Sequence, residues 1–151
     1  MRTTIVTGAG GFIGGHLVKD LLADGQAVRA VDRKPFSEWY QIDDRAENVV
    51  ADLQDPAACD AALAGAGDVF NLAADMGGMG FIENNRALCM LSVLINTNLL
   101  LAAQKHDIDR YFFASSACVY AEEHQTSPDV TALAEEDAYP AMPEDGYGWE
   151  K

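Results

Sequence analysis

Two residues near the end of the chain are spaced for proton chemistry. Tyr147 and Lys151 stand four residues apart in the segment EDGYGWEK, and this spacing puts both side chains on one face of a helix. A phenol with its ordinary pKa of about 10 is a poor base at neutral pH. A lysine ammonium beside it favours the phenolate. The pair is therefore a candidate for taking a proton from a hydroxyl group, and Ser116 is a candidate to hydrogen-bond the same hydroxyl.

A glycine-rich turn lies near the start of the chain. TGAGGFIG places Gly8, Gly11 and Gly14 between a β-branched run and a helical pattern. Gly8 permits a tight turn, Gly11 lets backbone approach a pyrophosphate, and Gly14 lets helix and strand pack closely. The N-terminus of the following helix offers N–H groups and a positive dipole to phosphates. The turn predicts a dinucleotide site.

Two acids after predicted strands would complete this site. Asp32 can accept hydrogen bonds from both hydroxyls of an adenine ribose and would repel a 2′-phosphate, which favours NAD over NADP. Arg33 and Lys34 follow at once and weaken that preference, because they can accept a phosphate. Asp52 is placed to meet the adenine amino group, and the alternative is that it only caps a turn before Pro56.

Strand and helix patterns alternate along the chain, so we expect an α/β fold. Right-handed crossovers then give a Rossmann-type, doubly wound parallel sheet of order 3-2-1-4-5, with ligand at the carboxyl ends of the strands. The expected strands are residues 3–7, 27–31, 49–51, 68–74 and 110–116. The expected helices are residues 12–24, 56–64 and 84–106. The acidic stretch 133–151, rich in Pro and Gly, predicts a loop in which a helix at Tyr147 has only begun.

Composition narrows the class of protein. A chain of 151 residues that is 49% hydrophobic suits one globular domain, residues 1–151. A net charge of −14 with only 10 Lys and Arg argues against nucleic acid. We expect no membrane span, and the lack of a secretory leader favours the cytoplasm. Cys59, Cys89 and Cys118 form no CxxC pair and the three histidines lack Cys or Asp at ligand spacing, so we expect no disulfide and no metal site.

These motifs together resemble the extended short-chain dehydrogenase/reductase family, whose members act on nucleotide sugars with NAD. The resemblance runs through all 151 residues and implies that the chain is the N-terminal, cofactor-binding part of an enzyme whose C-terminal substrate domain is absent here. It is carried by the glycine turn, Asp52–Leu53, NLAA (71–74), SSACVY (115–120) and Tyr147-x-x-x-Lys151. For the cofactor it implies contacts from Gly8, Gly11, Phe12, Ile13, Gly14, Asp32, Asp52, Leu53, Leu72, Ala73, Ala74, Tyr147 and Lys151.

Within the family, three segments are similar to the 3,5-epimerase branch that acts on GDP-mannose: NLAADMGGMGFI (71–82), ASSACVY (114–120) and DAYPAMPEDGYGWEK (137–151). This similarity implies that the Gly77 backbone, Ser116, Ala117 and Cys118 meet the substrate. Tyr147, Lys151 and Ser116 would oxidise C4 of the hexose, which acidifies the hydrogens at C3 and C5. Cys118 would be the acid/base at one of these carbons, with a lysine beyond this chain at the other; a thiol suits that task.

Two alternatives use the same oxidation step. The 4,6-dehydratases carry an Asp-Glu pair where Ala117 and Cys118 stand, and the 4-epimerases usually carry Thr at the Cys118 position. A third alternative is an NAD-binding module without turnover. The resemblance also implies a homodimer for the longer protein. In this chain the long helix would then expose an apolar patch, for which we expect Leu91, Leu94, Leu99 and Leu100.

Overall fold

A computed structural model of the chain describes residues 2–74, 80, 84–125, 132–143 and 146–151. The chain divides into two compact units. The first comprises residues 1–74 and 92–113, and the second comprises residues 75–91 and 114–151. The helix α4 (Arg86–Lys105) contributes residues to both.

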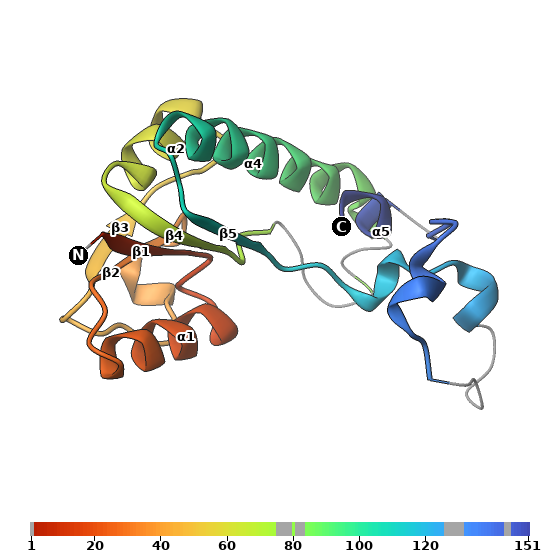
Figure 1. The fold of residues 1–151 in the computed structure, drawn as a ribbon, viewed down its shortest axis with the longest axis horizontal. Coiled ribbons are helices and arrows are strands. Elements are labelled where there is room, and N and C mark those ends of the chain that lie inside the picture. Colours follow the sequence, from red (N-terminus) through yellow and green to blue (C-terminus); the bar gives the residue numbers. More distant parts are fainter. Residues whose placement is uncertain (1, 75–79, 81–83, 126–131, 144–145) are drawn as a thin grey trace. The chain divides into compact units, whose positions relative to one another are not determined.

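The first unit is a five-stranded parallel sheet. Its strands are β1 (Thr3–Thr7), β2 (Val28–Asp32), β3 (Glu47–Val50), β4 (Ala66–Asn71) and β5 (Arg110–Phe113). They lie in the order β3-β2-β1-β4-β5 and every neighbouring pair is parallel. The helix α1 (Phe12–Ala23) covers one face, while α2 (Pro56–Leu63) and α4 cover the other (Figure 1). This confirms the predicted Rossmann-type, doubly wound sheet.

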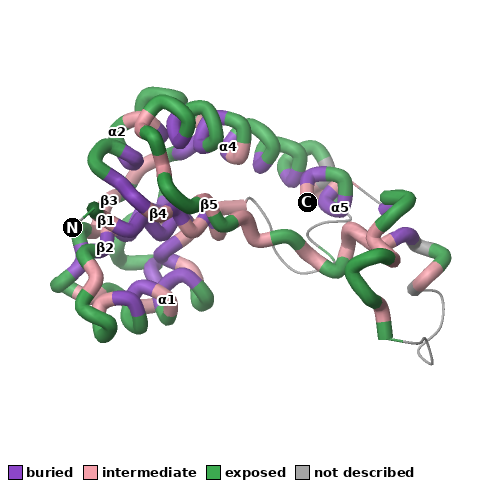
Figure 2. The backbone as a smooth tube through the Cα atoms, in the orientation of Figure 1, coloured by how far each residue is buried: buried purple, intermediate pink, exposed green. Residues whose placement is uncertain are grey.

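The two faces of the sheet have separate cores, because successive residues of a strand point to opposite sides. Ile5 of β1 packs with residues of α2 and α4, including Leu63 and Leu99. Its neighbour Val6 packs toward α1 against Val18 and Leu21. The three inner strands β1, β2 and β4 are accordingly mostly buried, whereas β3 and β5 at the two edges have no fully buried residue (Figure 2).

The helix ends follow their residue types. Gly25 has φ +77° just after α1, as expected for a glycine that ends a helix. Asp55 caps α2 by accepting a hydrogen bond from the Ala57 N–H at 2.9 Å, and Pro56 occupies the first helical position. The cap of α2 is thus Asp55, a residue that the sequence analysis passed over.

Two predicted strands end earlier than expected. β4 stops at Asn71 and β5 stops at Phe113, so residues 72–74 and 114–116 are not strand. After Asn71 the Ala73 N–H donates to the Thr7 side chain at 3.3 Å instead of to a neighbouring strand.

The second unit holds short 3-10 turns, η2 (Ala117–Val119), η3 (Glu122–Gln125) and η4 (Glu135–Ala138), and the helix α5 (Gly146–Glu150). The stretch predicted as a loop therefore contains η4 before the helix at Tyr147.

The long helix α4 is more apolar than the sequence analysis allowed. Residues 87–105 are long and apolar enough to cross a membrane by length and composition, with a mean hydropathy of 1.6. One such helix is weak evidence of a span, because a helix packed on a sheet passes the same test. Here Ile95, Leu99 and Ala102 face the core of the first unit. The prediction that Leu99 is exposed was wrong, whereas Leu91, Leu94 and Leu100 are exposed.

Candidate functional site

The glycine turn joins the end of β1 to α1, and two of its glycines are required by space. Gly8 has φ +68°, and a Cβ there would lie 2.7 Å from the Leu72 carbonyl oxygen. A Cβ on Gly14 would lie 2.3 Å from the Gly8 carbonyl oxygen. Gly11 is the N-cap residue of α1, and no side chain caps the backbone N–H groups at this end of the helix. The tight turn and the close packing are as predicted, and a role for Gly11 in approaching a pyrophosphate stays a prediction.

A contact between Gly10 and Trp39 also holds this turn, and the sequence analysis missed it. A Cβ on Gly10 would lie 2.8 Å from the Trp39 ring. The Gly10 N–H donates to Asp32 Oδ2 at 3.0 Å, and its carbonyl accepts from the Tyr40 N–H at 2.9 Å. Trp39 is buried with residues of α1 and β2 and donates from Nε1 to the Lys34 carbonyl. The Trp39 ring thus packs against the turn at Gly10 and helps to hold it in place.

Asp32 ends β2 and is held by backbone donors. Its Oδ2 accepts from the Gly10 N–H and its Oδ1 accepts from the Lys34 N–H, each at 3.0 Å. A carboxylate has about four acceptor positions. Each oxygen therefore keeps a lone pair for a further donor such as a hydroxyl group.

Asp52 and Leu53, which follow β3 shortly after its end, have different surroundings. Asp52 is exposed, and its Oδ1 accepts from the Gln54 N–H at 3.0 Å, which closes a turn. The turn-capping alternative is therefore observed, and the predicted adenine contact stays a prediction. Leu53 is 4% exposed and its side chain lies in the core of the first unit. Only its backbone remains to serve the predicted cofactor contact, and its carbonyl accepts from the Cys59 thiol.

A buried polar network lies where β1 and β4 end. The Thr7 hydroxyl donates to Asn71 Oδ1 at 2.8 Å, and Asn71 Nδ2 donates to Asn96 Oδ1 at 2.8 Å. Thr7 and Asn71 are 0% and 2% exposed. Leu72, Ala73 and Ala74 follow and are half-buried. Because strands in a parallel sheet end at one edge, these residues share that edge with the glycine turn, Asp32 and Asp52.

The predicted catalytic residues come together in the second unit. Tyr147 of α5 is 7% exposed and packs with Cys89 of α4 and with Cys118 of η2. Ser116 forms a side-chain hydrogen bond with Tyr147. Ser116 also begins η2, where its hydroxyl accepts from the Cys118 N–H at 3.2 Å. Ala117 is exposed beside them.

Burial dominates the electrostatics of Tyr147 in the chain without cofactor. Burial raises the pKa of its phenol above the ordinary value, although the hydrogen bond from Ser116 acts to lower it. The Lys151 Nζ lies 5.7 Å from the centre of the Tyr147 ring. The same nitrogen lies 3.4 Å from Glu150 Oε1, and both side chains are buried. Lys151 therefore faces a carboxylate as well as the phenol, and Glu150 is a site residue that sequence reasoning missed.

Gly148 lets α5 approach Cys118. A Cβ on Gly148 would lie 2.3 Å from the Cys118 carbonyl oxygen and 2.5 Å from Pro143 Cβ. Only a glycine fits between these atoms, so the residue after Tyr147 sets how closely the tyrosine meets η2. The sequence signal was present as the Gly in Tyr-Gly-x-x-Lys, but its neighbours could not be read from it.

Other predicted residues lie elsewhere. Gly77 and most of its glycine-rich loop lie outside the described residues. His106 lies just after α4, and its Nε2 is 2.8 Å from Asp60 Oδ1, a contact between distant positions that the sequence does not indicate. Within the described ranges no group of three or more His, Cys, Asp or Glu could hold a metal ion.

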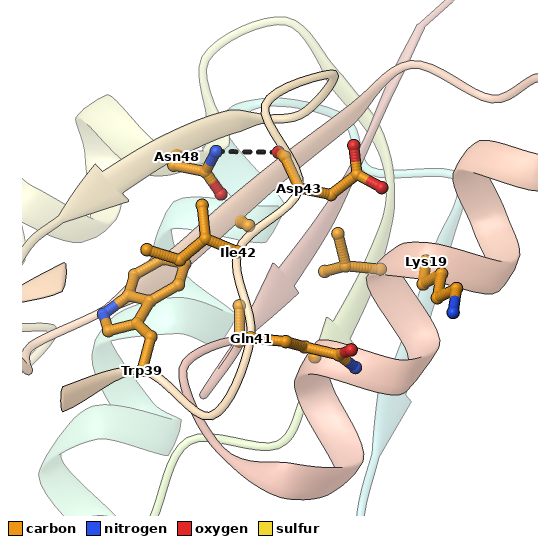
Figure 3. A pocket seen from close by; sticks show the side chains of 10 residues that line it. Lys19, Trp39, Gln41, Ile42, Asp43 and Asn48 are labelled. Carbon is orange, nitrogen blue, oxygen red and sulfur yellow. Dashed lines mark hydrogen bonds between the residues drawn. The ribbon is translucent and has the colours of Figure 1, made fainter. Parts of the chain in front are cut away.

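A pocket of about 200 Å³ lies between α1 and the segment that leads into β3, with Lys19, Trp39, Gln41, Ile42, Asp43 and Asn48 on its walls (Figure 3). Gln41 Nε2 and Asn48 Oδ1 are buried without a protein partner, and an ordered water would satisfy such atoms. None of the predicted cofactor-binding residues lines this pocket.

The residues at the sheet edge fit a dinucleotide. The first turn of α1 has no side-chain cap, so its N–H groups and dipole are available to a diphosphate. Phe12 and Ile13 of this turn are 61% and 69% exposed. Asp32 keeps lone pairs for the hydroxyls of a ribose. Tyr147 and Lys151, which are predicted to serve the nicotinamide end, belong to the second unit, and their cofactor contacts stay a prediction.

Comparison with known proteins agrees with this arrangement. The sequence matches the NAD dependent epimerase/dehydratase family over residues 4–151. GDP-mannose 3,5-epimerase 1 of Oryza sativa subsp. japonica is 43% identical over 147 residues, which cover 97% of this chain and 39% of the rice protein. The chain thus spans about two fifths of the length of this relative.

Two solved structures are similar along almost the whole chain. A short-chain dehydrogenase/reductase superfamily protein of Agrobacterium tumefaciens with bound NAD has a TM-score of 0.80 and 30% identity, with 99% of this chain and 42% of that chain covered. The UDP-glucose 4-epimerase of Thermus thermophilus in complex with NAD has a TM-score of 0.82 and 25% identity, with 99% and 47% covered. The chain belongs to the NAD dependent epimerase/dehydratase family, and its cofactor is NAD.

Proposed function

We propose that the parent protein, meaning the natural product in which this chain occurs, is an NAD-dependent nucleotide-sugar epimerase that acts on GDP-mannose at C3 and C5. The observation that carries the proposal is the packing of Cys118 against Tyr147, with Ser116 hydrogen-bonded to the same phenol. An acid/base for a ring carbon is thereby held beside the base for the neighbouring hydroxyl. The 43% identity to a GDP-mannose 3,5-epimerase supports the choice of substrate.

Each site residue then has a role. NAD, when bound, would supply reversible hydride transfer at C4, which side chains cannot supply. Tyr147 takes the proton of the C4 hydroxyl, and Ser116 hydrogen-bonds the oxygen of that hydroxyl. Once C4 is a ketone, the hydrogens at C3 and C5 are acidic, and Cys118 exchanges the proton at one of them. Lys151 holds the ribose of the nicotinamide half, and Asp32 holds the adenine ribose.

The charge state of Tyr147 links these steps to cofactor binding. Because burial raises its pKa above 10.0, the phenol is protonated at neutral pH in the chain alone. A base must lose that proton, so additional positive charge near the ring is needed. We propose that NAD brings this charge, and that the site becomes basic only when it is loaded.

Deuterium exchange tests the reaction. With GDP-mannose, catalytic NAD and deuterated water, the parent protein should place deuterium at C3 or C5 of the recovered sugar, as read by NMR. Turnover with label at neither carbon would refute the proposal and favour a 4-epimerase, and elimination of water would favour a 4,6-dehydratase. Ala117 and Cys118 stand where the dehydratases carry Asp and Glu, which weighs against the latter.

The second candidate is that these 151 residues alone bind NAD without turnover. The residues for the cofactor are present, while the chain covers only 39% of the rice relative. Calorimetric titration should detect NAD binding to the purified chain, and incubation with GDP-mannose should leave the sugar unlabelled. Epimerisation by the isolated chain would contradict this second candidate and leave the first intact.

We also propose that the parent protein is a homodimer through α4. Seven apolar side chains of this helix are 36–62% exposed: Leu88, Met90, Leu91, Val93, Leu94, Leu100 and Leu101. A group of exposed apolar side chains on one helix is typical of a surface that another chain covers. Light scattering should report a dimer for the parent protein and a loss of dimer for Leu101→Lys, whereas a monomeric parent would contradict the proposal.

A further inference from the structure

Glu150 is a buried carboxylate close to the proposed catalytic cluster, which consists of Tyr147, Lys151, Ser116 and Cys118. Its side chain is 0% exposed, and its Oε1 lies 3.4 Å from Lys151 Nζ, whose own side chain is 5% exposed. The same Nζ lies 5.7 Å from the centre of the Tyr147 ring. The ammonium therefore lies close to a carboxylate on the very helix that carries the phenol.

This pairing is buried. Glu150 is the last residue of α5, Lys151 follows it directly, and the two side chains are 0% and 5% exposed. Burial of both charges is costly unless they are paired. Charges in such a place also act on their neighbours more strongly than charges in water. Glu150 is thus positioned to change what Lys151 does to Tyr147.

Several neighbouring groups can influence the ionisation of Tyr147. Ser116 and Cys118 face it from the segment of η2, and Cys89 faces it from α4. Within the described ranges, Glu150 at the end of α5 supplies a carboxylate near it, and Lys151 directly after α5 supplies an ammonium. Glu150 is among the groups that raise the pKa of Tyr147, after burial.

We propose that Glu150 is a positioning residue that holds the Lys151 ammonium beside Tyr147 and offsets its charge, so that the phenol keeps its proton until a further positive charge enters the site. It rests on the proposed function only in treating Tyr147 as the base. Removal of the Glu150 charge takes one negative charge away from Lys151 and Tyr147, which makes the tyrosinate easier to form. The Glu150→Gln variant should therefore ionise Tyr147 at lower pH than the wild-type chain does.

The test is a pH titration of the chain itself, without cofactor or sugar. Tyrosine labelled with ¹³C at Cζ is incorporated, and the Tyr147 resonance is assigned by its absence from Tyr147→Phe. Glu150→Gln should lower the Tyr147 pKa by about 1 unit, the low end of what a nearby charge does. Glu150→Asp, which keeps the charge, should restore most of the wild-type value. Glu136→Gln, an exposed acid of the same unit, should change nothing.

Tyr111 is an internal control, because burial in the first unit raises its pKa to about 12 independently of α5. An unchanged or higher Tyr147 pKa in Glu150→Gln would overturn the proposal. If Glu150→Gln does not fold, Lys151→Met is compared with Glu150→Met/Lys151→Met, in which no charge is left unpaired. The double variant should titrate about 1 unit below Lys151→Met, and equal values would overturn the proposal. Neither outcome depends on which reaction the parent protein catalyses.

Discussion

Replacement of Gly148 by alanine should uncouple Tyr147 from the rest of the catalytic cluster. The new Cβ would lie 2.3 Å from the Cys118 carbonyl oxygen and 2.5 Å from Pro143 Cβ, whereas ordinary contacts begin at 3.4 Å. One obstacle is backbone and the other is a buried proline ring, so neither can swing away as a flexible side chain would. The helix α5 must therefore move from η2 by about 1 Å.

The magnitude follows from opposing terms. Alanine favours a helix over glycine by about 1 kcal/mol, and overpacking costs about 1–3 kcal/mol. The unit should therefore lose at most about 2 kcal/mol and stay folded. A displacement of about 1 Å at a reacting group can reduce turnover about 10²-fold. NAD binding should change far less, because the glycine turn and Asp32 belong to the first unit.

The assay measures kcat of the parent protein and the Tyr147 ¹³Cζ resonance of the chain. Gly80→Ala is the comparison variant, since Gly80 belongs to the same unit, has no positive φ and has no atom of a described residue within 4 Å of the added Cβ. The reasoning fails if Gly148→Ala keeps kcat within about twofold of Gly80→Ala and leaves the resonance unshifted.

Three further predictions concern the first unit. Asn71→Ala removes hydrogen bonds to Thr7 and Asn96 and leaves a buried gap. Urea denaturation should therefore show a free energy of unfolding lower by about 2–4 kcal/mol. A decrease of less than about 0.5 kcal/mol would show that the network is dispensable. Asp32→Ala removes an acceptor of ribose hydroxyls and should weaken NAD binding about 10–100-fold by calorimetry. Its affinity for NADP should equal that of the wild type. Equal weakening of NAD and NADP binding would mean that the glycine turn itself had lost its structure. Hydrogen bonds from Lys105 and then His106 lower the pKa of Asp60, so its contribution is present above about pH 4 and is lost as pH falls through its folded value. The urea midpoint of Asp60→Asn should therefore lie below that of wild type at pH 6 and approach it as pH falls below about 4, and a constant gap would contradict this assignment.

Some of the site could be predicted because its restraints are local in sequence. Gly8, Gly14 and Asp32 are recognised by their spacing around one strand, one turn and one helix, and the structure gives each a steric or hydrogen-bonding reason. The strand order followed in the same way from the alternation of elements. Tyr147 and Lys151 could be paired because both belong to one helical turn.

Other features could not be predicted because they depend on segments that are distant in sequence. The carbonyl that makes Gly148 necessary belongs to Cys118, 30 positions earlier. The burial of Glu150 likewise depends on what packs around α5. The error at Leu99 is different: Leu99 lies four residues after Ile95 and shares its buried face, while the adjacent Leu100 points away. Helical period distinguishes these two leucines, and the prediction did not apply it.

The hydrogen bond between Thr7 and Asn71 also bears on how the chain avoids misfolding. β1 is a run of β-branched residues, and Thr7 pairs directly with Asn71 in the register between β1 and β4. A slip by one position would bring Phe70 or Leu72 opposite Thr7 and would leave buried polar groups unmatched, which is costly. An apolar strand alone would tolerate several alignments. The polar pair at the carboxyl ends of β1 and β4 thus fixes the alignment of these two strands, and variants that lack it should populate shifted pairings during refolding.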